Sequence, residues 1–253
     1  MSTASEKRLV IVNADDLGLS AGINRGIFEC HENGIVTSAS LMVRWPAAKE
    51  AAEFASAYPA FSVGLHLDMG EWVYRAEEWQ PLYEVLPPDA GQAEHVAEAR
   101  RQLDHFRALV GREPSHLDSH QHRHRSEPLR SIALEICQEL RIPLREIASP
   151  ASYFGSFYGQ SSQGQSHPEW VSPESVISFF GRVPSGISEL GCHPASEVDF
   201  DSIYAAERLL ELRTLCDPLV RAAMEAHGLQ LISFRDIPQE RMVAAPGTLR
   251  ALP

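Results

Sequence analysis

The sequence predicts an α/β fold: a (β/α) barrel-like sheet of about seven parallel strands, in a single domain. Short apolar runs alternate with amphipathic segments along the chain, which is typical of parallel βαβ units rather than of hairpins. The 253 residues are 44% hydrophobic, so the chain can bury a full core, and barrels of this length commonly form one domain. We expect the core of this domain at about residues 9–234, and a surface tail or a partner-contacting arm at residues 235–253.

Seven apolar runs are the candidate strands, and seven amphipathic segments are the candidate helices. The strands are expected at Leu9–Val12, Val36–Met42, Ser62–Leu67, Ser115–Ser119, Ile142–Ile147, Ile187–Cys192 and Gln230–Phe234. The helices are expected from the capping residue Ser20 to His31 and at Ala47–Ala57, Glu94–Val110, Leu129–Leu140, Pro173–Phe180, Ser202–Cys216 and Leu219–His227. Pro46 and Pro128 stand before two of these helices, where a first-turn proline is favoured.

Two long stretches, Asp68–Ala90 and Ser149–Pro168, interrupt this rhythm and are expected to be loops. Long loops in a compact domain are usually either functional or disordered. Both carry aromatic residues, and flat substrate faces can stack on such rings. We therefore predict that the loops form substrate-binding walls, although a simple cover for the barrel ends fits the sequence equally well. The candidate contacts are Trp72, Trp79, Tyr153 and Tyr158.

Charge and cysteine usage exclude several classes of partner. Asp and Glu outnumber Lys and Arg by 34 to 22, giving a formal charge of −12, and no basic block with interleaved aromatics occurs. Nucleic acid and anionic membranes are therefore not expected partners. Only four apolar residues, Leu9–Val12, follow the polar start of the chain, which is too few for a signal peptide or a membrane span. We expect a cytoplasmic protein without membrane insertion. The four cysteines form no C-x-x-C pair, so neither a disulfide framework nor a thiolate zinc site is expected.

Side chains that bind hard metal ions follow three of the expected strands. They occur in Val12–Asp16, in Val63–His66 and in His116–His122. Carboxylates and imidazoles without thiolates suit Zn²⁺, Mn²⁺ or Mg²⁺, and a catalytic site keeps three protein ligands so that water can occupy an open position. Because the carboxyl ends of parallel strands meet at one edge of a sheet, we expect these residues to converge. The pattern predicts a metallohydrolase.

The acidic pair Asp15-Asp16 is the first component of such a site. An acidic pair after a strand can also form a simple turn. However, adjacent residues at a strand end point in different directions, so one carboxylate can bind an ion while the other moves a proton. His193 ends another expected strand and is placed as a proton donor. Its neighbour Cys192 faces the opposite way, which argues against a Cys–His dyad.

Histidines supply the other candidate ligands. His66 alone would more often be a satisfied core histidine. Four histidines, at positions 116, 120, 122 and 124, fall within nine residues, and one of them is expected to be a ligand. The others would orient it or contact substrate; a purely structural cluster is the alternative, although neighbouring imidazoles repel when protonated. Asp118 could hold a ligand imidazole through its second nitrogen.

Several separated motifs, in order, resemble the YdjC-like carbohydrate deacetylases. They are Asn13-Ala14-Asp15-Asp16-Leu17-Gly18-Leu19-Ser20, Gly34-Ile35-Val36-Thr37-Ser38, Val63-Gly64-Leu65-His66-Leu67, His116-Leu117-Asp118-Ser119-His120-Gln121-His122 and His193-Pro194. The resemblance extends from Leu9 to about Phe234, and the family includes chitooligosaccharide deacetylases and deacetylases linked to hopanoid synthesis. The sequence departs from the family at Asp68–Glu78, at Arg123 and at Ala195, which leaves the choice of sugar open.

This resemblance implies a barrel-like fold and one divalent metal ion, Mg²⁺ or Zn²⁺, bound by one aspartate and two histidines. By likeness, Asp16, His66 and His120 are the ligands, Asp15 is the general base and His193 is the proton donor. The implied activity is metal-dependent removal of N-acetyl groups from an amino sugar or oligosaccharide. We add His122 and His124 to the predicted substrate contacts.

Two other functional classes remain alternatives at this point. One is a different metal-dependent amidase or a phosphoesterase on a similar barrel, which would need a basic grip for phosphate. Arg44, Arg123 and Arg125 are the obvious candidates for it. The other is a sugar-binding relative without turnover, although such a protein needs neither a base nor an acid. The sequence leaves the oligomeric state open, with a homodimer as one option.

Overall fold

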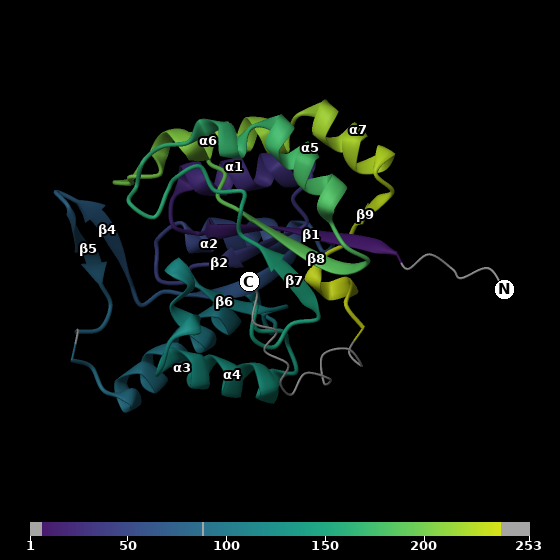
Figure 1. Cartoon of the computed structure of the whole chain (residues 1–253). Coiled ribbons are helices and arrows are strands. Elements are labelled where there is room, and N and C mark those ends of the chain that lie inside the picture. Colours follow the sequence, from purple (N-terminus) through teal and green to yellow (C-terminus); the bar gives the residue numbers. More distant parts are fainter. Residues whose placement is uncertain (1–6, 88, 239–253) are drawn as a thin grey trace.

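The computed structural model describes residues 7–87 and 89–238, and its centre is a seven-stranded parallel sheet. The strands are β1 (Arg8–Leu17), β2 (Ser38–Leu41), β3 (Ser62–Leu67), β6 (Leu117–Ser119), β7 (Ala151–Phe154), β8 (Gly186–Cys192) and β9 (Leu229–Leu231). They follow the order β6-β3-β2-β1-β8-β7, and β9 pairs with the start of β1, ahead of β2. The sheet curls into a half-barrel (Figure 1), which confirms the predicted fold class.

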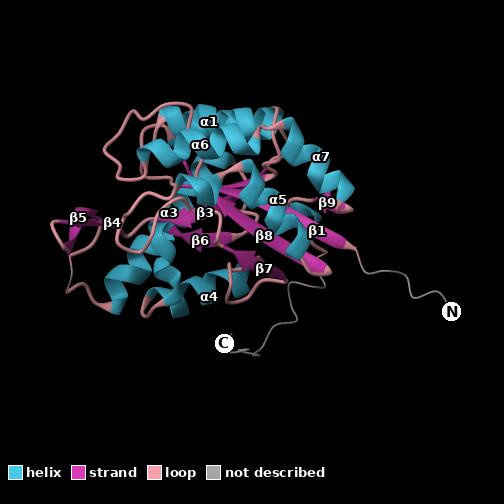
Figure 2. Ribbon diagram, turned by 45° about the horizontal axis from the view of Figure 1, so that its top comes forward, coloured by secondary structure: helices cyan, strands magenta, loops and turns pink. Residues whose placement is uncertain are grey.

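Helices cover the outside of the curled sheet. They are α1 (Ala21–Glu32), α2 (Ala48–Ala57), α3 (Gln92–Val110), α4 (Leu129–Leu140), α5 (Pro173–Arg182), α6 (Ala205–Leu215) and α7 (Pro218–Ala226). Helices α1, α5, α6 and α7 lie on one side, and α3 and α4 lie on the opposite side (Figures 1 and 2). The side chain of Ser20 caps α1 by accepting a hydrogen bond from the backbone of Ile23 at 3.1 Å. Within the described ranges, every helix is too short or too polar to cross a membrane.

The alternation of side chains along β1 separates two apolar clusters. Val10 and Val12 belong to the large core between sheet and helices. Ile11 faces the other way, into the barrel, where it joins a small cluster with Ala151, Ile187, Phe234 and Ile237. This cluster fills the barrel interior toward the beginnings of β1 and β8. The polar residues of the site can therefore occupy the opposite end, where the strands terminate.

The segment after β9 contributes Phe234 and Ile237 to this small apolar cluster. The folded core therefore extends beyond the predicted boundary of the tail at residue 235. A short 3-10 helix, η3, covers Phe234–Asp236, where the sequence predicted the end of a strand. Ile237 is only 3% exposed because it packs inside the barrel. The start of the predicted tail is thus part of the folded core, and residues 239–253 lie outside the described residues.

The prediction of a strand at Ile142–Ile147 was wrong. This segment makes only isolated bridges, from Leu144 to Leu117 and to Ala148. Proline at position 143 lacks a backbone N–H, and Glu146 has a left-handed φ of 61°, so the chain turns instead of extending. The stretch Ser149–Pro168, which was expected to be a loop, instead contains strand β7, which pairs with β8.

The stretch Asp68–Ala90 is not a plain loop either. It contains an antiparallel hairpin of β4 (Gly70–Arg75) and β5 (Glu78–Glu84). The connecting residues Ala76 and Glu77 have φ values of 52° and 66°, which suit a tight hairpin turn but are uncommon for these residue types. The hairpin stands apart from the main sheet (Figures 1 and 2).

Candidate metal centre and active site

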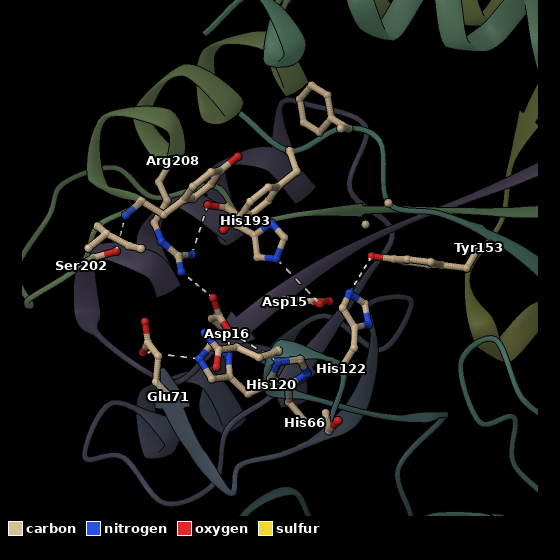
Figure 3. Close-up of a pocket in the computed structure, with 18 of the residues that line it drawn as sticks. Asp15, Asp16, His66, Glu71, His120, His122, Tyr153, His193, Ser202 and Arg208 are labelled. Carbon is tan, nitrogen blue, oxygen red and sulfur yellow. Dashed lines mark hydrogen bonds and ion pairs between the residues drawn. The ribbon is translucent and has the colours of Figure 1, made fainter. Parts of the chain in front are cut away.

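A cavity of about 310 Å³ lies where β1, β3, β6 and β8 end, and it collects most of the predicted site residues (Figure 3). The predicted residues that line it are Asp15, Asp16, His66, His120, His122, Tyr153, Tyr158 and His193. They come from strand ends that are distant in sequence, as the parallel sheet requires.

Three other predicted contacts lie outside this cavity. Trp72 and Trp79 line a neighbouring hollow with Gln121 and Arg123, and Gln121 lines both spaces. His124 lines neither: it is fully buried, and its Nδ1 lies 2.7 Å from Ser119 Oγ. His124 therefore contacts Ser119 at the end of β6 and does not line either space.

Asp16, His66 and His120 form the candidate metal centre. All three are buried, and their potential ligand atoms lie within 4.8 Å of one another. His120 Nδ1 and His66 Nε2 face the same oxygen, Asp16 Oδ1, at 2.9 and 3.5 Å. One carboxylate and two imidazoles beside an open cavity form a donor set that suits a divalent ion with exchangeable positions. The residues present therefore fit the implied metal.

Two alternative groupings of ligand-type residues are less suited to an ion. One contains Asp15, whose two oxygens both bind the guanidinium of Arg145. The other contains Glu146, whose Oε2 accepts from Arg125 Nε at 2.6 Å. In the first group, Arg145 thus binds both oxygens of the Asp15 carboxylate. By contrast, Arg208 contacts only Oδ2 of Asp16, at 2.5 Å, which leaves Oδ1 facing both imidazoles.

The end of β1 is bent so that both adjacent aspartates reach the cavity. A regular strand would direct them to opposite faces. Here the pairing with β2 shifts register between Ala14 and Leu17, and Asp16 adopts a left-handed φ of 66°. Aspartate tolerates this conformation better than most residues, so an acidic residue suits the position both conformationally and chemically.

Further polar residues hold the candidate ligands. His66 Nδ1 lies 2.7 Å from Asp118 Oδ1. Burial disfavours the imidazolium, but the carboxylates of Asp118, Asp16 and Asp15 together outweigh burial and raise the pKa of His66 to about 9. Burial likewise opposes ionisation of Asp16, yet the charges of Arg208 and His120 hold its pKa well below the usual value. An ionised carboxylate is thus available to a cation.

Asp15 is held by Arg145, which sequence reasoning did not identify. Nη1 and Nη2 of Arg145 donate to the two carboxylate oxygens of Asp15, each at 2.7 Å. Burial would raise the pKa of Asp15, but Arg145 outweighs it, and the pKa is lowered. Arg145 also donates to Glu189 at 2.7 Å, and burial raises the pKa of Glu189 to about 7. The only signal in the sequence was the charged pair Arg145-Glu146 within the expected strand 142–147.

His193 lies on the other side of Asp15, with Nε2 3.9 Å from Asp15 Oδ2 (Figure 3). Its Nδ1 lies 3.9 Å from Glu211 Oε1 on α6, and its backbone N–H donates to the same carboxylate. The hydroxyl of Tyr204 donates to Glu211 Oε1 at 2.5 Å. The ring of His193 therefore lies between two carboxylates, and its backbone is held by Glu211. Glu211 was missed because one acid on an amphipathic helix resembles a surface residue.

Tyr153 and Tyr158 form aromatic walls of the cavity. A side chain at Gly191 would place its Cβ 2.6 Å from the Tyr153 hydroxyl, so glycine is required there to admit the tyrosine. Tyr158 stacks on Tyr204 with ring centroids 4.3 Å apart, and burial raises the pKa of Tyr158 to about 12. Tyr158 therefore stays protonated at neutral pH.

The fold and the site together define a barrel-like α/β protein with a candidate metal centre at the strand ends. The chain belongs to the YdjC-like protein family, whose model matches residues 9–226. It is 32% identical over 250 residues to a carbohydrate deacetylase from Geobacillus stearothermophilus, covering 90% of this chain and 98% of the relative. It is 30% identical to a chitooligosaccharide deacetylase from Serratia marcescens, covering 91% and 100%.

Solved structures share the fold. A candidate cellobiose-phosphate cleavage protein from Enterococcus faecalis superposes with a TM-score of 0.73 and 24% identity, covering 91% of this chain and 98% of that chain. A family 4 carbohydrate esterase from Streptomyces lividans, solved with acetate, gives a TM-score of 0.54 at 15% identity, covering 92% and 96%. At these identities the likeness concerns the fold alone.

Proposed function

We propose that the protein is a metal-dependent hydrolase that removes N-acetyl groups from an amino sugar or oligosaccharide. The observation that carries this proposal is the convergence of Asp16, His66 and His120 on one edge of a cavity, with Asp15 and His193 beside them. The carbohydrate deacetylases and chitooligosaccharide deacetylases among the relatives support the same activity.

Asp16, His66 and His120 would hold one divalent ion, Mg²⁺ or Zn²⁺. When bound, such an ion supplies a Lewis acid that polarises the amide carbonyl and acidifies water. The contacts of Asp16 keep its carboxylate ionised, so it contributes a negative charge. The two imidazoles contribute neutral nitrogen ligands once they have lost their protons.

Asp15 would be the general base. Arg145 fixes its carboxylate and keeps it ionised, so it can accept the proton of the attacking water. The water oxygen forms a bond to the acetyl carbon, and the bond from that carbon to the sugar nitrogen breaks. His193, which lies on the side of Asp15 away from Arg145, would protonate the departing nitrogen. The products are acetate and the free amino sugar.

The remaining predicted residues would contact the sugar. Tyr153, Tyr158 and His122 line the cavity and would hold the ring that carries the acetyl group. Trp72 and Trp79 line the adjoining hollow and would stack on a further ring of an oligosaccharide. A phosphate substrate is less suited to this cavity, because both arginines that line it, Arg125 and Arg208, are paired with carboxylates.

A panel of N-acetylated mono- and oligosaccharides and sugar phosphates tests the function. We expect equal amounts of acetate and free amine from at least one N-acetylated substrate, with no phosphate released. Phosphate release without acetate would indicate the phosphoesterase alternative. Tight sugar binding with no product from any member would indicate a binding protein.

We also propose that residues 9–234 act as one catalytic domain, since the family model spans nearly all of this range. A cytoplasmic location and a homodimer stay predictions.

A further inference from the structure

Two carboxylates face the far nitrogens of the two candidate imidazole ligands. His66 directs Nε2 to Asp16, and its Nδ1 lies 2.7 Å from Asp118 Oδ1. His120 is arranged the other way round: its Nδ1 lies 2.9 Å from Asp16 Oδ1, and its Nε2 lies 3.4 Å from Glu71 Oε2. Each ring therefore lies between Asp16 and a second carboxylate, and Figure 3 shows His120 between Asp16 and Glu71.

We propose that Glu71 is a positioning residue of the metal centre, which holds His120 through Nε2 so that Nδ1 is presented to the ion. This inference rests on the metal site of the proposed function. A ligand imidazole usually donates its other N–H to a carboxylate or carbonyl, which fixes the ring and its tautomer. The buried Nε2 of His120 has no hydrogen-bond partner among the described residues, so Glu71 is the acceptor that it faces.

The hairpin that carries Glu71 is attached to the loop that carries His120. The backbone N–H of Trp72 donates to Gln121 Oε1 at 2.9 Å, and Gln121 Nε2 donates to the Trp72 carbonyl at 2.7 Å. Glu71 and Trp72 are neighbours on β4, and His120 and Gln121 are neighbours at the end of β6. Two adjacent contacts therefore fix the hairpin against the candidate ligand.

The environment of Glu71 favours this role over a surface role. Its side chain is only 14% exposed, and it lines the cavity with the candidate ligands. Asp118 reaches His66 from within the barrel, whereas Glu71 reaches His120 from a hairpin outside the main sheet. The hairpin thus completes the metal centre in addition to covering it.

Metal affinity measured without substrate tests the proposal. Glu71→Gln keeps the size of the side chain and removes its charge, and Glu71→Asp keeps the charge. Glu78→Gln, an exposed position on the same hairpin, is the matched control. The dissociation constant for Zn²⁺ is measured by chelator competition, and the visible spectrum of bound Co²⁺ reports the ligand field. Thermal unfolding before metal addition checks the fold of each variant.

We expect Glu71→Gln to raise the Zn²⁺ dissociation constant about 10- to 100-fold and to alter the Co²⁺ spectrum. Glu78→Gln should match the wild type, and Glu71→Asp should lie between wild type and Glu71→Gln. An unchanged affinity and spectrum in Glu71→Gln would overturn the role of Glu71, as would equal losses in the Gln and Asp variants. If the wild type itself binds neither ion, the metal site of the proposed function fails instead.

Discussion

Arg145 binds both oxygens of Asp15 through two hydrogen bonds of 2.7 Å, although 130 positions separate the two residues in sequence. The same guanidinium lies 2.8 Å from Asp118 and 2.7 Å from Glu189. One fully buried cation thus pairs with carboxylates from three strands. This arrangement keeps Asp15 ionised at the edge of the cavity.

Replacing Arg145 should therefore destabilise the whole barrel. In Arg145→Met, three buried carboxylates lose their shared partner, and leaving a buried charge uncompensated costs about 3–5 kcal/mol. We expect a fall of that size in the free energy of unfolding, measured with urea at pH 7. Arg130→Met, at an exposed position on α4, should change stability by less than about 0.5 kcal/mol. Similar small losses in both variants would contradict this account of Arg145.

The pH dependence of metal affinity follows from the pKa values of the candidate ligands. Burial disfavours both imidazolium ions, but the nearby carboxylates, chiefly Asp118 for His66 and Asp16 together with Glu71 for His120, raise the pKa of His66 to about 9 and that of His120 to about 10. A metal ion must displace both protons below these values. We expect the dissociation constant for Zn²⁺ to fall by about 100-fold per pH unit between pH 6 and 8, because two protons are released.

The dissociation constant for Zn²⁺ should stop changing with pH once both imidazoles are neutral, above about pH 10. Chelator competition at several pH values, corrected for the protonation of the chelator, measures it. A pH-independent affinity between pH 6 and 8 would show that His66 and His120 do not bind the ion.

The fold was largely predictable because its signal is local. Apolar runs and capping residues such as Ser20 mark the elements one at a time, and the end of each run locates the cavity. The failed strand at 142–147 has a physical reason. Pro143 lacks a backbone N–H and Glu146 has a left-handed φ of 61°, so the chain turns there, while Arg145 in the same segment binds three distant carboxylates that no local pattern reveals. The β4–β5 hairpin was missed because Ala76 and Glu77 lack the glycine or asparagine that usually marks its turn.

The exposed Trp79 of the hairpin should affect how well the protein uses longer substrates. Trp79 is 58% exposed and lines the hollow beside the cavity. Trp79→Ala should raise KM for an N-acetylated oligosaccharide, by about 10-fold if it removes one stacked ring, and leave a monosaccharide nearly unaffected. The control is Trp170→Ala, since Trp170 is also exposed, at 40%, on η2 (Pro168–Val171). Equal effects of the two variants, or of Trp79→Ala on both substrates, would count against a sugar subsite.

The role of His193 depends on the leaving group. An amide nitrogen must be protonated as it departs, whereas the leaving group of an activated ester departs without a proton. We expect His193→Ala to lower kcat for the N-acetylated sugar by about 10²–10⁴-fold and to affect an activated acetate ester much less. Steady-state rates on both substrates measure the difference. Equal losses on amide and ester would make His193 a structural or binding residue.

The site was partly predictable for a related reason. Ligand-type residues follow three expected strands, so the sequence predicted that they converge, and the family resemblance selected Asp16, His66 and His120 among them. Glu71, which faces His120, and Glu211, which contacts His193, come from a hairpin and a helix in which an acid resembles a solvated residue. Their roles depend on how these elements pack, which periodicity does not encode.

Acetate release from an N-acetylated oligosaccharide, measured as a divalent ion is added back to chelator-treated protein, tests the central claim most directly. We predict that the rate rises with added ion and reaches a plateau at one equivalent per chain. Asp15→Asn should bind the same one equivalent while its rate at the plateau is about 10²–10⁴-fold lower. Full activity before any ion is added, or an Asp15→Asn variant as fast as the wild type, would contradict a metal-dependent deacetylase that uses Asp15 as its base.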